Sequence, residues 1–149
     1  MPRFALFFLA TCLGLSAAPA PLRVLVWDER QPEQKKGYAG AFLGDTLAKH
    51  LSAQPGLSVK SVGMDDPDQG LADATLAATD VVVFWCHQRP LQQNDARMEA
   101  LVQQVMAGKT GFIALHSAHW AKPFVRLMQE RAKADALAQV PAAERATRS

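Results

Sequence analysis

Apolar residues along the chain form short runs separated by polar segments. Continuous runs at residues 23–27, 81–85 and 112–115 are typical of strands buried on both faces of a sheet. A fourth run, at 57–64, alternates apolar and polar positions, which also predicts a strand. The run at 81–85 has no polar interruption, so we expect it in the middle of a parallel sheet.

Helical patterns occupy the segments between these runs. Leucines four residues apart predict an amphipathic helix over 43–51, and a short helix is expected over 71–78. The clearest helical spacing begins at the N-cap pair Asn94 and Asp95 and ends at Gly108, and a last helix begins near Pro123. Because strands and helices alternate, with connections long enough for parallel pairing, the sequence predicts a three-layer, doubly wound α/β fold with a mainly parallel sheet.

The first twenty residues have the pattern of an export signal. Arg3 precedes an uncharged run over 4–18, and Ala18-Pro19-Ala20 places small residues where a signal peptidase cuts. The apolar stretch is shorter than the ~20 residues of a spanning helix, so we expect an exported protein, periplasmic or secreted, rather than a membrane-anchored one. Cleavage after Ala20 removes Cys12 and leaves Cys86 unpaired, which excludes an intramolecular disulfide.

Composition and charge narrow the class of partner. The chain is 49% hydrophobic and 20% charged, as in ordinary globular proteins. Sixteen basic and 14 acidic residues give a formal charge of +2 with no basic tract, so nucleic acid is not an expected partner. Residues 129–149 are mainly alanine, glutamine and charged residues, which predicts a polar helical tail after a domain over 21–128.

Chemically useful side chains gather where the predicted strands end. Ligands of open parallel sheets bind beyond the carboxyl ends of the strands. Three of the four histidines and all three tryptophans fall there. The candidate residues are Trp27, Asp28 and Glu29 after the first strand, Trp85, Cys86 and His87 after the third, and His116, Ser117, His119 and Trp120 after the fourth.

The histidines allow three interpretations. His116 and His119 could share a divalent metal such as zinc, with His87 or Glu29 completing the ligands. The same imidazoles could instead act as acid and base without metal, oriented by Glu29 or Asp28. In the third interpretation the histidines only hydrogen-bond the loop backbone.

The remaining candidates point to ligand binding or to packing. Trp27, Trp85 and Trp120 could form an apolar platform for a sugar ring, although core packing is favoured for Trp85. Cys86 is expected to be a small buried residue. Ser117 follows a strand but lacks the flanking glycines of a nucleophile elbow, so we expect it to contact substrate rather than attack it.

Four motifs carry a family resemblance, at residues 24–29, 66–71, 80–87 and 113–120, the last continuing through 122–124. With these motifs the chain resembles the trehalose-utilisation (ThuA-like) family, whose fold is related to flavodoxin and to class I glutamine amidotransferases. The resemblance implies metabolism of trehalose or related keto-sugars, with His87, His116, His119 and Glu29 as the candidate catalytic residues. Because His116 stands where amidotransferases keep a cysteine, glutamine hydrolysis is not expected.

The chain also departs from the family pattern. Cys86 replaces a glycine, and Pro32 and Pro90 stand where family members have histidines, so potential metal ligands are lost. Family domains continue with further strands, which predicts an incomplete, amino-terminal domain whose sheet is covered by a protein partner or by self-association. We therefore weigh two hypotheses, a sugar-metabolising ThuA-like domain and a noncatalytic carbohydrate-binding or interaction module, the latter including an inactive fragment.

Overall fold

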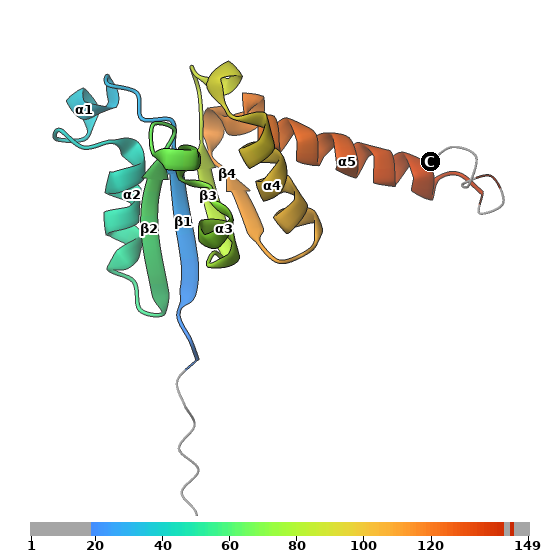
Figure 1. Cartoon of the computed structure of the whole chain (residues 1–149), viewed down its shortest axis with the longest axis horizontal. Helices are drawn as coiled ribbons and strands as arrows, with labels where there is room; N and C mark the ends of the chain where they lie inside the picture. Colours follow the sequence, from blue (N-terminus) through green and yellow to red (C-terminus); the bar gives the residue numbers. More distant parts are fainter. Residues whose placement is uncertain (1–18, 142–143, 145–149) are drawn as a thin grey trace, which may run out of the picture.

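The chain folds as an α/β protein in a computed structural model that describes residues 19–141 and residue 144 (Figure 1). The predicted signal segment, apart from Pro19 and Ala20, lies outside the described residues, as does most of the sequence after residue 141. The strands are β1 (Leu22–Asp28), β2 (Leu57–Gly63), β3 (Val81–Trp85) and β4 (Gly111–Ala114). The helices are α1 (Gln34–Gly37), α2 (Leu43–Ser52), α3 (Asp73–Ala77), α4 (Asp95–Met106) and α5 (Lys122–Ala138), with 3-10 turns η1 (Pro67–Gly70), η2 (Pro90–Gln92) and η3 (His116–Trp120).

The four strands form one parallel sheet in the order β2-β1-β3-β4. The two most apolar strands, β1 and β3, lie in the middle, as their uninterrupted hydrophobic runs predict. Strand order reverses between β1 and β3. After β1 the chain continues to β2 at one edge of the sheet, and after β3 it continues to β4 at the other edge. This arrangement confirms the predicted doubly wound α/β class and is flavodoxin-like.

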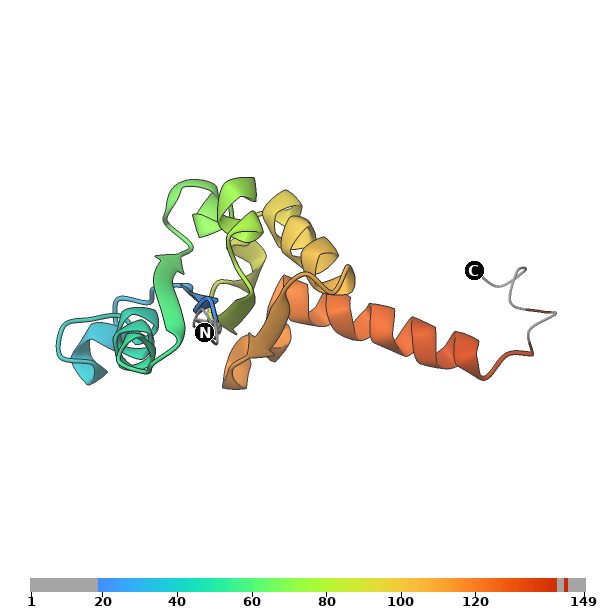
Figure 2. The same ribbon diagram turned by 90° about the horizontal axis from the view of Figure 1, so that it is seen from below.

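Helices cover the sheet from both sides (Figure 2). On one side, α3 and α4 lie over a core that includes Leu25, Phe84 and Leu101. On the other side, α2 covers a smaller core around Val26 and Ala48. The fold therefore has three layers, with the larger core between the sheet and the α3–α4 layer.

Local signals account for the helix boundaries. The Asn94 side chain accepts a hydrogen bond from the Arg97 backbone N–H at 3.1 Å, as expected of the N-cap of α4. Pro123 lies in the first turn of α5, where its missing N–H costs nothing. The single-turn α1 and the three 3-10 turns fall in segments that we predicted to be loops or parts of loops, because elements this short leave no periodic pattern.

Helix α5 continues without a break through residue 128, where the domain was predicted to end. It spans 17 residues, and its second half projects away from the rest of the molecule (Figure 1). Between residues 19 and 141 no helix combines the length and the apolar character needed to cross a bilayer.

Candidate functional site

The carboxyl ends of β1 and β3 meet at the point where strand order reverses. Asp28, the last residue of β1, is in register with Trp85, the last residue of β3. The sheet thus brings together the candidate residues that follow these two strands, as predicted. Their side chains, however, are occupied in ways that the sequence did not indicate.

Glu29 is fully buried and surrounded by donors. One carboxylate oxygen accepts hydrogen bonds from the Gln31 side chain and from the Gln88 backbone N–H, the latter at 2.8 Å. The other accepts from the Arg89 backbone N–H at 2.8 Å and from Cys86 Sγ at 3.0 Å. These four bonds fill the acceptor capacity of the carboxylate. In this structure Glu29 therefore fixes the loop after β3, and its expected role as acid, base or metal ligand stays a prediction.

The same contacts set the protonation of Glu29 and Cys86. Burial raises the pKa of Glu29, but the hydrogen bonds from Cys86 and from the backbone of Gln88 and Arg89 outweigh it, and the net pKa is lowered. Burial, followed by the bond to Glu29, raises the pKa of the Cys86 thiol well above its ordinary range. Cys86 is thus buried as predicted, and it is a neutral donor rather than a nucleophile.

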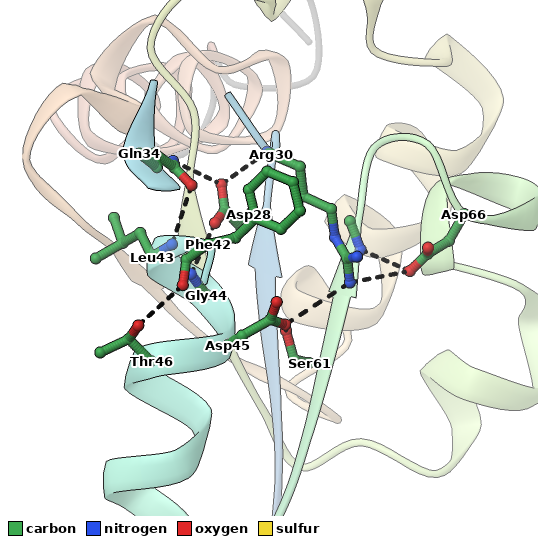
Figure 3. A network of polar contacts seen from close by, with 11 residues as sticks. Asp28, Arg30, Gln34, Phe42, Leu43, Gly44, Asp45, Thr46, Ser61 and Asp66 are labelled. Atoms are coloured by element: carbon green, nitrogen blue, oxygen red, sulfur yellow. Dashed lines mark hydrogen bonds and ion pairs between the residues drawn. The ribbon is translucent and has the colours of Figure 1, made fainter. Parts of the chain in front are cut away.

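Asp28, predicted to contact substrate, is also buried and occupied (Figure 3). One of its oxygens accepts a bond from the Gly44 backbone N–H at 2.7 Å, at the start of α2. The other accepts from the Arg30 backbone at 2.8 Å and from the Gln34 side chain at 3.1 Å. Because one oxygen bonds the first turn of α2 and the other bonds the Arg30 backbone and the Gln34 side chain, Asp28 holds this helix against β1.

Arg30 forms a second polar contact at this end of the sheet, one that we did not predict. Its guanidinium lies 3.6 Å from Asp66 and 3.9 Å from Asp45, and it stacks over Phe42 at 5.5 Å (Figure 3). The approach requires Gly63, since a Cβ there would come within 2.0 Å of Arg30 Nε. Arg30 therefore joins the loops after β1 and β2.

Trp27, expected either in a sugar platform or in the core, lies in the core. Its side chain is fully buried, its ring stacks on Phe84 at 4.1 Å, and its indole N–H donates to the Gln69 carbonyl at 2.8 Å. No face of the ring is open to a ligand. Trp85 is half-buried rather than fully packed, and its ring lies 6.4 Å from that of His87.

The three candidate histidines are exposed but do not form a metal centre. His87, His116 and His119 all lie on the surface at the carboxyl ends of β3 and β4. Within the described part of the chain, no three histidine, cysteine or carboxylate side chains lie close enough to hold a metal ion. The proposed ligation of a divalent metal by His116 and His119 with His87 or Glu29 is therefore not supported, since Glu29 is already saturated.

The turn after β4 has an unusual backbone. His116 adopts a φ of 39°, in the left-handed region that non-glycine residues rarely occupy. The Nδ1 atom of His119 lies 3.3 Å from the His116 carbonyl oxygen. Ser117, predicted to contact substrate, is 5% exposed and lies buried within the turn η3.

Of the three tryptophans considered for a sugar platform, Trp120 has the side chain that is largely exposed to solvent. It is 67% exposed and lies 5.2 Å, ring to ring, from His119. Its side chain lines a groove of about 390 Å³ between α4 and α5. Apolar walls come from Met98, Val102 and Val125, and polar groups come from Asp95, Glu99, Lys122, Arg126 and Gln129.

The charges in this groove are paired with one another. Lys122 Nζ lies 2.5 Å from Asp95 and donates to the Gln93 carbonyl at 2.7 Å. Arg126 lies 3.5 Å from Glu99 and also pairs with Glu130. The groove is therefore apolar on one side, balanced in charge and rich in both donors and acceptors.

Comparisons with known proteins do not assign this chain. No protein-family model matches it, and a search of curated proteins finds no match.

The groove could not be found from the sequence. Asp95, Glu99, Lys122 and Arg126 each appear in helices as ordinary solvated charges. They share a site only because α4 and α5 pack side by side, which is a tertiary contact with no local pattern. Trp120, the exposed aromatic residue, was the one signal that pointed there.

Proposed function

We propose that this protein is an exported carbohydrate-binding domain, with its ligand site in the α4–α5 groove. The observation that carries the proposal is the 67% exposed Trp120 at the wall of a groove of about 390 Å³, a volume typical of small-ligand sites. An indole face suits the apolar C–H face of a sugar ring, since it buries area without demanding a hydrogen bond.

The polar groups of the groove fit the hydroxyls of a sugar. Asp95 and Glu99 supply carboxylate acceptors, and Lys122 and Arg126 supply donors. Because these charges already pair with one another, the groove has no unbalanced charge to attract an ion. A neutral, polyhydroxylated ligand can hydrogen-bond to both kinds of group.

A binding role is favoured over catalysis by the state of the two carboxylates expected to orient the histidines. A general base needs a free lone pair near its substrate and a partner that orients it. Glu29 and Asp28 have their oxygens occupied by backbone and side-chain donors, so neither is free to orient a histidine. The noncatalytic hypothesis therefore agrees better with the geometry than the sugar-metabolising one.

Two sequence features support the ThuA-like resemblance and the export of the protein that this proposal includes. The four motifs after the strands resemble the ThuA-like family, for which trehalose and related sugars are the expected ligands, and the flavodoxin-like strand order agrees with that resemblance. Arg3, the run over 4–18 and Ala18-Pro19-Ala20 support export. Mass spectrometry of the exported protein should give Pro21 as the first residue, whereas an intact Met1 would contradict cleavage.

Binding is tested by calorimetric titration of the protein with trehalose and with glucose. We expect saturable binding that Trp120→Ala weakens at least tenfold, equivalent to about 1.4 kcal/mol. Leu91→Ala is the matched control, because Leu91 is 89% exposed but does not line the groove. This variant should bind the sugars with the affinity of the unsubstituted protein. Equal loss in both variants, or no binding of either sugar, would contradict the proposal.

A further inference from the structure

The two edges of the sheet differ in how they are protected. At one edge, β2 carries the exposed Lys60, a charge that discourages pairing with another strand. At the other edge, residues 110–115 contain no charge and no proline. Among the described strands, none pairs with the outer side of β4.

The unpaired backbone groups of β4 can be assigned. Gly111 and Leu115 donate their N–H groups inward to Asp80 and Phe84 of the β3 segment, at 2.8 and 3.0 Å. Because backbone groups alternate sides along a strand, the N–H and C=O of Phe112 and Ala114 point to the open edge. Two residues therefore offer four hydrogen-bonding groups to an incoming strand.

The side chain between them is also uncovered. Ile113 is 50% exposed and lies on the face of the sheet that α2 covers. Helix α2 packs on β1 and β2, and no described helix extends over β3 and β4 on that side (Figure 2). The half-buried Val81 and Trp85 lie on the same face, so an apolar surface adjoins the open edge.

We infer that β4 pairs antiparallel with β4 of a second copy of this chain, joining the two sheets into one of eight strands. An uncharged strand is compatible with itself, because antiparallel pairing opposes no like charges. The open groups fix the register: Phe112 of each copy pairs with Ala114 of the other through two hydrogen bonds, four in all, and the two Ile113 residues face each other. In such a non-hydrogen-bonded pair the Cα atoms are about 4.5 Å apart, so the two Ile113 side chains bury each other.

A second copy also fits the position of α5. This helix projects beyond the β4 side of the molecule (Figures 1 and 2). Met128, one of its residues, is 48% exposed. A partner sheet continuing from β4 would lie on the side to which α5 extends. The interface therefore combines strand pairing with apolar contacts, as stable homodimers require.

Cysteine crosslinking tests the register directly. In the full chain with Cys12→Ser, Ile113→Cys should form a disulfide-linked dimer on mild oxidation, since a Cα separation near 4.5 Å suits a disulfide. Met106→Cys is the matched control, because Met106 is similarly exposed, at 49%, but lies on α4. Crosslinking of both variants at equal rates, or of neither, would overturn the inference.

The solution mass tests the same interface without a new cysteine. Light scattering should give the unsubstituted protein twice the mass of one chain, and Ile113→Lys should give the single mass while its circular dichroism stays that of a folded protein. The inference would be overturned if the unsubstituted protein had the mass of one chain at every concentration up to its solubility limit. A dimer that persists in Ile113→Lys would also overturn it. If Ile113→Lys does not fold, the crosslinking result decides.

Discussion

Glu29 stabilises the loop after β3 by accepting four hydrogen bonds while fully buried. We predict that Glu29→Gln lowers the free energy of unfolding by about 2 kcal/mol at pH 7, because a buried carboxylate bonded to several donors is worth more than a neutral amide that leaves donors unpaired. Urea denaturation measures the change. Glu33→Gln, at an exposed position, is the control and should change the stability little.

The lowered pKa of Glu29 predicts how stability depends on pH. The folded pKa lies below the ordinary value of 4.5, so the unfolded chain binds the proton more readily. The contribution of Glu29 is complete above about pH 4.5 and is lost as the pH falls through the folded pKa. The loss of stability on acidification should therefore be shallower in Glu29→Gln than in Glu33→Gln, and parallel curves would contradict the assignment.

At the same scale, the sequence predicted where the candidate side chains gather but not what they do. Strand ends are visible in the apolar pattern, so Asp28, Glu29 and His87 were correctly placed at the carboxyl edge. Their roles depend on partners such as Gly44 and Gln88, which are distant in sequence and become neighbours only in the fold. Trp27 shows the same limit, since Phe84 and Gln69 enclose it.

At the scale of elements, the cap of α4 is the clearest link between sequence and structure. We predict that Asn94→Ala lowers the free energy of unfolding by about 1 kcal/mol, because the Arg97 N–H loses its acceptor. Asn94→Asp keeps an acceptor at the same place and should retain most of the stability. Thermal or urea unfolding distinguishes the two, and equal losses would show that the cap contributes nothing.

The elements that the sequence predicted well are those with a repeated pattern. The prediction for β3 matches the structure residue for residue, and α4 begins after its predicted cap. The loop after β4 was wrong in detail, because η3 depends on the left-handed backbone of His116, for which a histidine gives no sequence signal. Helix α5 runs past its predicted change of character, since alanine and charged residues favour helix even without a core to cover.

At the scale of the whole molecule, the predicted fold is confirmed, and the position of the ligand site stays a prediction. The reversal point between β1 and β3, where such folds commonly bind ligands, is filled by the protein's own Asp28, Glu29 and Arg30. Open space with an exposed aromatic side chain lies instead between α4 and α5. The proposed binding site therefore lies in the helical layer beside β4, whereas the residues at the reversal point bond one another.

The proposed function requires that a sugar binds against Trp120. Each tryptophan of the chain has a distinct environment: Trp27 is buried and hydrogen-bonded to Gln69, Trp85 is half-buried, and Trp120 is exposed. Their indole N–H groups therefore give separate signals in nitrogen-resolved NMR spectra, with Trp120→Phe assigning the third. On titration with trehalose we predict a saturable shift of the Trp120 signal while that of Trp27 stays in place; spectra in which Trp120 does not move, or only Trp85 does, would contradict the account.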